Sequence, residues 1–321
     1  MPKYTFLLPA FKGRFLNEML RSIQSQTYTN FKVIISDDCS PEDLRSICEP
    51  YLSDPRFTYR RNEENMGSKS LVAHWNLLVD MCDTEYLIMA SDDDIYAPNY
   101  LEEIDILIQK YPYVDLIRGR MGVFDNELHE IKQDRYFPEY VSHIGFISHH
   151  FAKGMCKCMA NFTFKTAALK NVGGIINMPL AWFSDEMTSL MLARNGCVNT
   201  NMIVFHFRVS GINISNSTPN PQTAKNKAIA TLKAEQWLKE FFDKIIKETD
   251  DQDKVAELTQ LRKKGCKIWR ELIYEWLNEV SILDAVCLIP QVLIRGNWNR
   301  RMMIPVIRHQ LKKALYFKTT K

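Results

Sequence analysis

Short apolar runs alternate with segments of helical periodicity through the first third of the chain. Phe15, Met19 and Ile23 recur at helical spacing between the first two runs. The strands are predicted at residues 4–8, 31–36, 57–61 and 86–90. Strands that alternate with helices of this length predict an α/β fold with a mainly parallel, doubly wound sheet.

Two of the predicted strands run directly into carboxylates. The fourth run is followed by Asp92, Asp93 and Asp94, and the second by Asp37 and Asp38. In an open parallel sheet, ligands bind beyond the carboxyl ends of the strands, so both acidic loops are expected at one edge. Neighbouring carboxylates repel one another unless they are solvated or hold a cation, and hard oxygen ligands suit Mg²⁺ or Mn²⁺. The triplet is therefore a candidate metal site, with a solvated turn that caps the next helix as the alternative.

The glycine-rich loops that commonly hold nucleotide phosphates are absent from the sequence. The chain contains neither GxGxxG nor GxxxxGK[ST], which argues against a nicotinamide or flavin cofactor and against a P-loop. A metal ion on Asp93 would then hold the phosphates. A carboxylate at the end of the second strand could accept hydrogen bonds from a nucleobase N–H or a ribose hydroxyl.

A second acidic pair opens a predicted helix further along the chain. Asp185 and Glu186 lie in its first turn, with Ser184 or Asp185 as the N-cap, and Gly196 ends the element. The spacing alone favours a capping carboxylate, and the alternative is a general base beside an acceptor pocket. Arg208 ends the next predicted strand and is either an anion partner or one half of a structural salt bridge.

Residues 126–154 form a polar and aromatic stretch without clean periodicity. Long irregular segments inside a compact domain are often binding loops. His143, His149 and His150 are conceivable metal or phosphate ligands, but the pattern favours loose surface side chains.

The composition is that of an ordinary soluble protein. Of 321 residues, 46% are apolar and 25% are charged, and the formal net charge is +3. No aromatic-rich basic motif indicates a nucleic-acid partner. The eight cysteines lack paired CxxC spacing and the N-terminus does not resemble a signal peptide, so reduced thiols in a cytoplasmic protein are expected.

The C-terminal region differs from the rest of the chain in its charge. Residues 217–221 are turn formers and predict a boundary between a domain at residues 1–216 and a helical region at residues 217–321. After Asp284 the chain has eight cationic residues, many apolar residues and no acidic residue. This pattern fits equally an amphipathic element on an anionic membrane surface and a packed helix with a solvated basic rim.

Five segments, in this order, resemble family 2 glycosyltransferases, which are inverting enzymes of the GT-A type, over about residues 3 to 216. The segments are LLPAFKGRFLNEMLRSIQSQTYTNFKVIISDDCS, ENMGSKSLVAHWN, EYLIMASDDDIYAP, FKTAALKNVGG and SDEMTSLMLARNG. The resemblance implies a Rossmann-like GT-A sheet flanked by helices, followed by a helical extension, and it implies Mn²⁺ or Mg²⁺ as the cofactor.

The resemblance also implies which residues hold the nucleotide. Pro9, Ala10 and Phe11 would line the nucleotide pocket. Asp38 would bind the uracil, with Asp37 as its close competitor.

Metal and catalytic roles follow from the resemblance in the same way. Asp93 would ligate the metal that bridges the diphosphate, and Asp92 would lie near the ribose or in the outer shell of the metal. Asp185 would be the catalytic base, with Glu186 in reserve, and Gly174 would lie along the acceptor site.

Three positions depart from the usual pattern of the family. Ser91 stands where many members carry an acidic residue, and Lys12 replaces the asparagine that often follows the aromatic residue of the first strand. Ser210 stands where relatives place a histidine after the last strand. His206 is a candidate substitute, with core packing as an equal alternative.

The implied activity is a metal-dependent, single in-line displacement from a nucleotide sugar, here a UDP-sugar, to a hydroxyl of a glycan or lipid-linked acceptor in cell-surface polysaccharide synthesis. Asp185 would accept the hydroxyl proton, the metal would stabilise the leaving diphosphate, and the anomeric configuration would invert. The implied location is cytoplasmic, peripheral on the inner face of the cytoplasmic membrane. Two alternatives remain. One is a non-catalytic membrane-associated module that binds nucleotide or glycan. The other is a sugar-nucleotide pyrophosphorylase, but the segment PAFKGRF of this chain is a poor match to the glycine-rich loop expected of such an enzyme.

Overall fold

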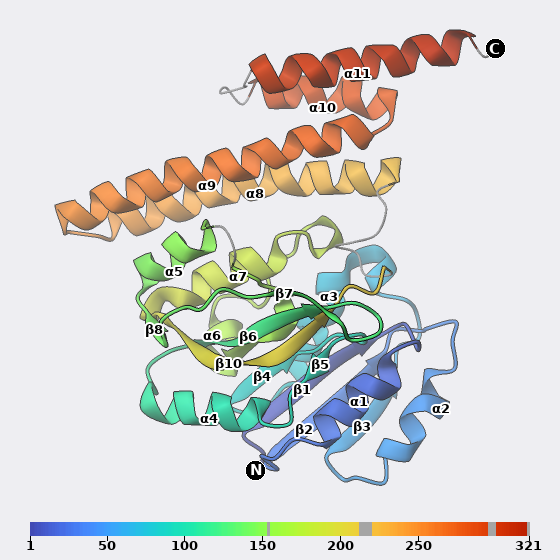
Figure 1. The fold of residues 1–321 in the computed structure, drawn as a ribbon, viewed down its shortest axis with the longest axis vertical. Coiled ribbons are helices and arrows are strands. Elements are labelled where there is room, and N and C mark those ends of the chain that lie inside the picture. The colour runs from blue at the N-terminus through green and yellow to red at the C-terminus, as the bar shows by residue number, and fades with distance from the viewer. Residues whose placement is uncertain (153–154, 212–219, 295–299, 320–321) are drawn as a thin grey trace. The chain divides into compact units, whose positions relative to one another are not determined.

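The computed structural model describes residues 1–152, 155–211, 220–294 and 300–319 (Figure 1). The chain divides into two compact units, Met1–Asn177 with Ser184–Asn216, and Met178–Phe183 with Ser217–Lys321. The boundary expected at residues 216 and 217 lies outside the described residues, so the domain assignment stays a prediction.

One sheet runs through the first unit in the order β3-β2-β1-β4-β9-β6-β10-β5, with β7 paired to β6 and β8 paired to β10 (Figure 1). Strands β3, β2, β1 and β4 are parallel, and β10 is parallel to β6, whereas β9 is antiparallel to both β4 and β6. The strands are β1 (Tyr4–Ala10), β2 (Phe31–Asp37), β3 (Phe57–Arg61), β4 (Tyr86–Met89), β5 (Ile95–Tyr96), β6 (Leu116–Phe124), β7 (Glu130–Gln133), β8 (Tyr140–Val141), β9 (Phe162–Lys165) and β10 (Cys197–Arg208). The predicted α/β class is confirmed, with a sheet that becomes mixed beyond β4.

Helices flank this sheet because each carries one apolar face. Met19 and Ile23 of α1 are fully buried, as the helical spacing predicts, and Phe6 of β1 packs edge-on against Tyr96 at 5.1 Å between ring centroids. The helices of this unit are α1 (Leu16–Gln24), α2 (Leu44–Cys48), α3 (Gly67–Met81), α4 (Tyr100–Lys110), α5 (His143–His150), α6 (Thr166–Asn171) and α7 (Ser184–Leu192), with 3₁₀ turns η1 (Glu49–Tyr51), η2 (Met159–Asn161) and η4 (Ala193–Asn195).

The stretch 126–154 is more regular than its sequence suggests. It contains β7, β8 and α5, so its interpretation as an irregular loop is wrong. The short strands β7 and β8 exist because they pair with the edges of β6 and β10, which local periodicity does not reveal. Ser142 caps α5 by accepting the N–H of Gly145.

The second unit is helical. Its elements are α8 (Pro221–Lys247), α9 (Gln252–Glu279), α10 (Ile282–Ile294), α11 (Arg300–Thr319) and the 3₁₀ turn η3 (Pro179–Ala181). Asn220 caps α8 by accepting the N–H of Thr223, and Asp251 caps α9. The segment Met178–Phe183 joins this unit through aromatic contacts, with Trp182 against Trp276 at 5.5 Å.

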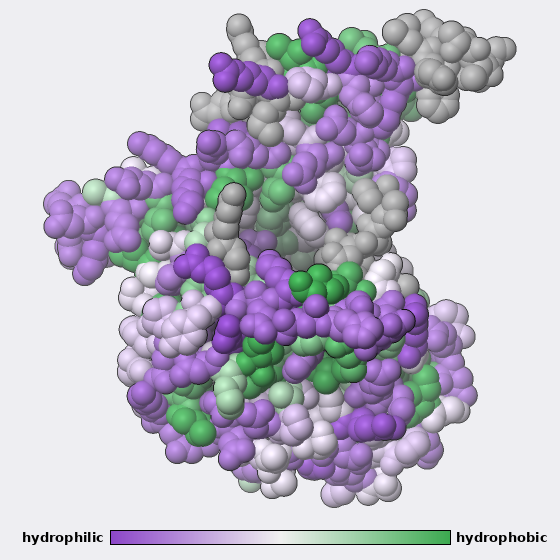
Figure 2. All heavy atoms as spheres, viewed as in Figure 1, coloured by the Kyte–Doolittle hydropathy of each residue, from purple (hydrophilic) through white to green (hydrophobic). Residues whose placement is uncertain are grey.

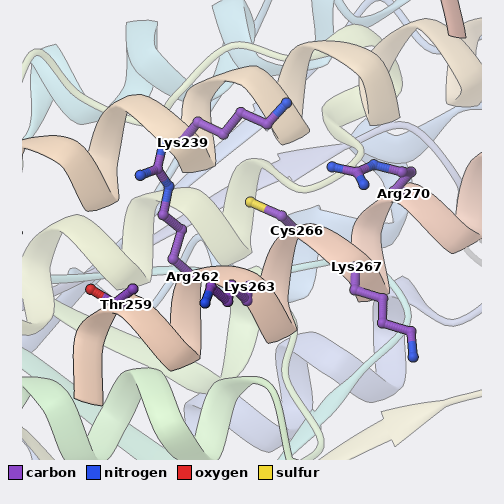
Figure 3. Close-up of a pocket in the computed structure, with 7 residues that line it drawn as sticks. All are labelled: Lys239, Thr259, Arg262, Lys263, Cys266, Lys267 and Arg270. Carbon is purple, nitrogen blue, oxygen red and sulfur yellow. The ribbon is translucent and has the colours of Figure 1, made fainter. Parts of the chain in front are cut away.

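Cationic side chains line a pocket of about 330 Å³ between α8 and α9 (Figure 3). In Figure 3, Lys239, Arg262 and Arg270 surround the thiol of Cys266, whereas Lys267 points away from it. Two of the guanidinium groups form ion pairs across the helices, Arg262 with Asp243 at 2.8 Å and Arg270 with Glu235 at 2.6 Å. These pairs tie α9 to α8 and give the cations a structural role.

Candidate active site

The loop between β4 and β5 carries the acidic triplet, and it is tied to the end of β1. Asp92 Oδ2 accepts the backbone N–H groups of Phe11 and Lys12 at 2.9 and 2.8 Å. Phe11 in turn accepts the hydroxyl of Ser40, which follows β2, at 2.6 Å. The ends of β1, β2 and β4 therefore meet at one edge of the sheet, as a parallel arrangement requires.

The remaining two carboxylates of the loop contact the end of β10. Ser210 donates its hydroxyl to Asp93 Oδ2 at 2.9 Å, and the backbone N–H of Arg208 donates to Asp94 Oδ1 at 2.9 Å. Ser91, at the position where relatives carry an acid, donates its hydroxyl to the other oxygen of Asp94. Ser210, which stands where a histidine was expected from the family resemblance, thus contacts the carboxylate of Asp93.

All three carboxylates of the triplet are buried. Burial and the charge of Asp93 raise the pKa of Asp94 to about 8. Burial also raises the pKa of Asp92, against the opposing charge of Lys12. The alternative of a solvated helix cap is wrong, because β5 separates the triplet from α4.

Lys12 brings a positive charge to this loop. Its Nζ lies 3.4 Å from Asp92 Oδ1 and 3.8 Å from Asp93 Oδ2. Within the part of the chain that the structure describes, no group of three His, Cys, Asp or Glu side chains is arranged to hold a metal. The carboxylate oxygens of Asp92 and Asp93 are nevertheless ligands of the kind that Mn²⁺ or Mg²⁺ prefers, and one oxygen of each already lies within 4 Å of the same cationic nitrogen.

Asp37 and Asp38 end β2 with different partners. Asp37 is fully buried, forms an ion pair with Arg61, and accepts the hydroxyl of Tyr59 at 2.6 Å and the N–H of Ser40 at 2.8 Å. A neighbouring cation thus balances its charge within the fold.

Asp38 is held mainly by N–H donors. It accepts the backbone N–H groups of Met66 and Gly67 at 2.9 and 2.7 Å, where α3 begins, and the side-chain amide of Asn62 at 2.8 Å. Which of Asp37 and Asp38 reads a nucleobase stays a prediction. Of the three residues expected to line the nucleotide pocket, Pro9 is partly buried, Ala10 is buried, and Phe11 is 37% exposed.

Arg208 is almost fully buried, and its guanidinium makes contacts inside the first unit. Nη2 pairs with Glu18 at 2.7 Å, Nε donates to the carbonyl of Asp93 at 3.0 Å, and the guanidinium lies 4.1 Å from the ring centroid of Phe15. The salt-bridge alternative therefore describes this side chain in the structure, and its diphosphate contact stays a prediction. The ring of His206 packs against that of Phe124, with 4.8 Å between the centroids and a tilt of 36°.

The acidic pair of α7 has strongly asymmetric surroundings. His150 Nε2 and Lys157 Nζ lie 2.8 and 3.0 Å from Glu186 Oε2. Burial opposes ionisation of Glu186, but the charge of Lys157 and the hydrogen bond from His150 outweigh it and lower its pKa to about 2. Burial lowers the pKa of His150 to about 4, so a neutral imidazole donates from Nε2. The interpretation of His150 as a loose surface side chain is wrong.

Asp185 has the opposite protonation behaviour. Burial and the charge of Glu186 raise its pKa to about 7. Burial also raises the pKa of the Cys158 thiol, and the charges of Asp94 and Asp185 both add to this effect. The acidic loop and the start of α7 thus each contain a carboxyl group whose pKa burial raises.

Gly174 occupies a position that only glycine fills without strain. Its φ is +85°, and an added Cβ would lie 2.6 Å from Oδ1 of Asn76. Asn76 bridges α3 to the next residue, since it accepts the N–H of Ile175 at 2.8 Å and donates to its carbonyl at 2.9 Å. Asn76 was not singled out from the sequence, although it lies in the segment ENMGSKSLVAHWN.

A family model described as "Glycosyl transferase family 2" matches residues 5–173, which is more than half of the chain. The chain belongs to the family 2 glycosyltransferases. Among curated relatives, an uncharacterized glycosyltransferase of Haemophilus influenzae is 34% identical over 31% of this chain and 32% of its own length. The Escherichia coli protein WcaA, named for colanic acid biosynthesis, is 37% identical over 26% of this chain and 29% of its own. The chain spans about a third of the length of the first curated relatives it matches.

Solved structures of glycosyltransferases share the fold. Staphylococcus aureus TarS (1–349) in complex with UDP-GlcNAc matches with a TM-score of 0.58 at 15% identity, over 88% of this chain and 82% of that one. The mannosyltransferase PcManGT of Pyrobaculum calidifontis, in complex with GDP-Man and Mn²⁺, matches with a TM-score of 0.51 at 12% identity, over 98% and 86%. The GT-A type expected for the family 2 glycosyltransferase sheet is thereby confirmed.

Proposed function

We propose that this family 2 glycosyltransferase is a metal-dependent, inverting enzyme that moves a sugar from a UDP-sugar to a hydroxyl of a glycan or lipid-linked acceptor. The observation that carries the proposal is the acidic loop, whose buried carboxylates Asp92 and Asp93 accept hydrogen bonds from the residues that follow β1 and β10. The loop supplies carboxylates suited to a cation and a diphosphate, and the acidic pair of α7 supplies one suited to a proton.

The donor class rests on the acidic loop and on the structural neighbours. TarS was crystallised with UDP-GlcNAc, which supports a uridine nucleotide, and the GDP-Man complex of the archaeal mannosyltransferase makes guanosine the competitor that a binding test must separate. Asp38, with Asp37 as the alternative, is the proposed base-reading residue, and Pro9, Ala10 and Phe11 the proposed pocket lining.

Asp185 is the proposed general base. Its pKa of about 7 lets the carboxylate exist ionised near neutral pH and still accept a proton as the acceptor oxygen attacks. Glu186 is unsuited to this role, because His150 and Lys157 hold it as a carboxylate with a pKa of about 2. The acceptor oxygen attacks the anomeric carbon on the face opposite the diphosphate, so the configuration inverts.

Asp93, with Asp92 beside it, is the proposed holder of Mn²⁺ or Mg²⁺. When bound there, the ion supplies Lewis-acid stabilisation of the leaving nucleoside diphosphate. Gly174 is the proposed residue at the acceptor side, where the hydrogen bonds of Asn76 with the neighbouring Ile175 hold the backbone close to α3. The names of WcaA and of TarS, a poly(ribitol-phosphate) β-N-acetylglucosaminyltransferase, support an acceptor among bacterial cell-surface polymers.

Thermal unfolding with a panel of nucleotide sugars and nucleoside diphosphates, each with Mn²⁺ and with EDTA, tests the donor and the metal together. Ligand at about 100 times its dissociation constant adds about 2.7 kcal/mol to the free energy of unfolding. A metal-dependent shift with UDP and not with GDP is the expected result. Release of pyrophosphate from a nucleoside triphosphate and a sugar phosphate would favour a pyrophosphorylase, and nucleotide binding without any transfer would favour the non-catalytic module.

We also propose that the helical unit binds an anionic membrane surface at the cytoplasmic side. The exposed face of α10 carries no charged residue: Leu283, Val286, Cys287, Pro290 and Ile294 follow one another at helical spacing. Leu283, Val286 and Ile294 are 80%, 66% and 83% exposed. Such a face needs a partner, because large contiguous apolar surfaces are uncommon on soluble proteins.

The neighbouring helix α11 adds cations to this surface. Ile304, Ile307 and Leu311 form an exposed apolar stripe, and Arg301, Arg308 and Lys312 lie beside it at the same helical spacing. Figure 2 shows hydrophobic and hydrophilic side chains side by side over α10 and α11. Interfacial helices have this pattern, in which apolar residues enter the headgroup region and cations attract acidic lipids. Among the described helices, none is long and apolar enough to cross a bilayer.

Vesicle sedimentation tests the membrane partner. The protein is expected to sediment with phosphatidylglycerol vesicles, less with phosphatidylcholine vesicles, and less at high salt. The double variant Leu283→Asp/Val286→Asp should lose this binding, whereas Ile106→Asp, which alters an exposed apolar residue of α4, should not. Equal sedimentation of both variants would refute the proposal, and a wild type that dimerises through this face without binding lipid would replace it.

A further inference from the structure

The ammonium group of Lys12 is the outermost charge of the acidic site. Its side chain is 30% exposed, whereas the side chains of Asp92 and Asp93 are each 7% exposed. A ligand that approaches the two carboxylates from solvent therefore meets Lys12 at their edge. Lys12 also stands where the family resemblance leads one to expect an uncharged asparagine.

The main chain fixes Lys12 in this place. Its backbone N–H donates to Asp92 Oδ2 at 2.8 Å, while its ammonium lies 3.4 Å from Oδ1 of the same carboxylate. The backbone and the side chain of Lys12 thus each contact one oxygen of the Asp92 carboxylate. The side chain needs only to rotate to exchange a carboxylate for a phosphate, because a lysine ammonium has three donors on a flexible stem.

The other cation of this region serves a different purpose. The guanidinium of Arg208 is almost fully buried and contacts Glu18 and two backbone carbonyls, those of Asp93 and Asn126. Lys12 is therefore the cation that the described residues place beside the carboxylates of Asp92 and Asp93 on the solvent side.

We propose that Lys12 is a donor-binding residue: its ammonium neutralises Asp92 and Asp93 in the absence of metal, and it binds the diphosphate of the nucleotide sugar when the donor enters. This inference rests on the proposed function of the same site. Lysine binds phosphate as a point charge. The sequence has no glycine-rich loop whose backbone N–H groups could bind the diphosphate instead. A divalent cation and Lys12 then compete for the same two carboxylates.

The proposal predicts opposite changes for two ligands in the variant Lys12→Met. Affinity for UDP in EDTA, measured by isothermal titration calorimetry, should fall about tenfold, because a charge-assisted phosphate contact is lost. Affinity for Mn²⁺ alone, measured from the free Mn²⁺ signal in electron paramagnetic resonance, should rise, because a competing positive charge is removed. Neither measurement depends on turnover.

Matched variants separate charge from damage to the loop. Lys12→Arg keeps the charge and should retain most of the UDP affinity, and Arg14→Met removes an exposed positive charge two residues away and should change neither affinity. Lys12→Gln, which keeps a polar but uncharged side chain, replaces Lys12→Met if the latter does not fold.

The outcomes also distinguish this inference from the proposed function. If the wild-type protein binds UDP but Lys12→Met binds UDP and Mn²⁺ just as well as the wild type, Lys12 has no donor-binding role and the proposed function stands. If the wild type binds no nucleoside diphosphate with or without Mn²⁺, both are overturned.

Discussion

The protein has two clusters of buried carboxylates, and their protonation behaviour differs. In the loop between β4 and β5, three carboxylates are buried together, and burial raises the pKa of both Asp92 and Asp94. In α7, two adjacent carboxyl groups differ strongly in pKa, which is about 7 for Asp185 and about 2 for Glu186. Asp92 and Asp94 of the loop therefore both resist ionisation, whereas the pair in α7 has one ionised group and one group with a pKa near neutrality.

The cations explain this difference. In the loop, the single positive charge of Lys12 is shared between two carboxylates, at 3.4 and 3.8 Å. In α7, Lys157 and His150 both contact Glu186, at 3.0 and 2.8 Å. Two neighbouring carboxylates acquire distinct protonation states when a cation and a hydrogen-bond donor contact only one of them, which is an arrangement suited to acid–base chemistry near neutral pH.

Replacement of the proposed base should have the largest effect. Asp185→Asn removes the proton acceptor but keeps the shape of the side chain, so turnover should fall about 10² to 10⁴-fold. UDP affinity should remain unchanged, because the acidic loop is intact. Turnover and calorimetric binding measured on the same preparation check this, with Asp43→Asn, at an exposed helix cap, as the control. Retained turnover in Asp185→Asn would remove it as the base.

Asp93→Ala tests the cation role of the loop. The part of the UDP-induced stabilisation that requires Mn²⁺, up to about 2.7 kcal/mol at 100 times the dissociation constant, should disappear, and the part that persists in EDTA should remain. Thermal unfolding with and without Mn²⁺ measures both parts. Asp83→Ala, which removes an exposed carboxylate paired with Lys32, should change neither. A Mn²⁺-dependent shift that survives in Asp93→Ala would place the metal elsewhere.

The split of the α7 pair predicts a pH profile. Turnover of the wild type should rise as pH increases through about 7, since Asp185 must lose its proton to act as a base. Glu186→Gln removes a negative charge that raises the pKa of Asp185, so the rising limb should move to lower pH by about one unit.

Lys157→Met should move the same limb in the other direction. The charge of Lys157 lowers the pKa of Asp185, and its removal should therefore shift the limb to higher pH. Opposite shifts in the two variants cannot arise from general damage to the site. If Glu186→Gln instead abolishes turnover at every pH while Asp185→Asn does not, Glu186 is the base.

The sequence alone predicted the half of the fold that local pattern controls. The segments at residues 4–8, 31–36, 57–61 and 86–90 became β1 to β4, of which β1, β2 and β4 are mainly buried and the edge strand β3 is partly exposed. The insertion of β9 between β4 and β6, antiparallel to both, was not predicted. Strand order beyond β4 depends on pairings between residues far apart in the chain, which no local period records.

The candidate site divides in the same way. The acidic residues could be found because they directly follow strands or open a helix. Their partners could not: His150 and Glu186 are 36 positions apart, and Ser210 and Asp93 are 117 apart. His150 in particular resembled a surface residue, since nothing in its neighbourhood along the chain shows that α5 buries it.

The smallest expected effect belongs to Ser210, which joins the loop to the end of β10. Ser210→Ala removes the hydroxyl that donates to Asp93, and the free energy of unfolding should fall by about 1 kcal/mol in EDTA. If the proposed cation binds Asp93, it would neutralise this carboxylate in place of the hydroxyl, so the loss should shrink when Mn²⁺ and UDP are present. Urea denaturation under both conditions measures the difference, with the exposed Ser53→Ala as the control. An equal loss under both conditions would mean that the hydroxyl of Ser210 stabilises the loop whether or not a cation is bound. The carboxylate of Asp93 would then not be the group that the cation neutralises, and the contrast between the loop and α7 would be weaker.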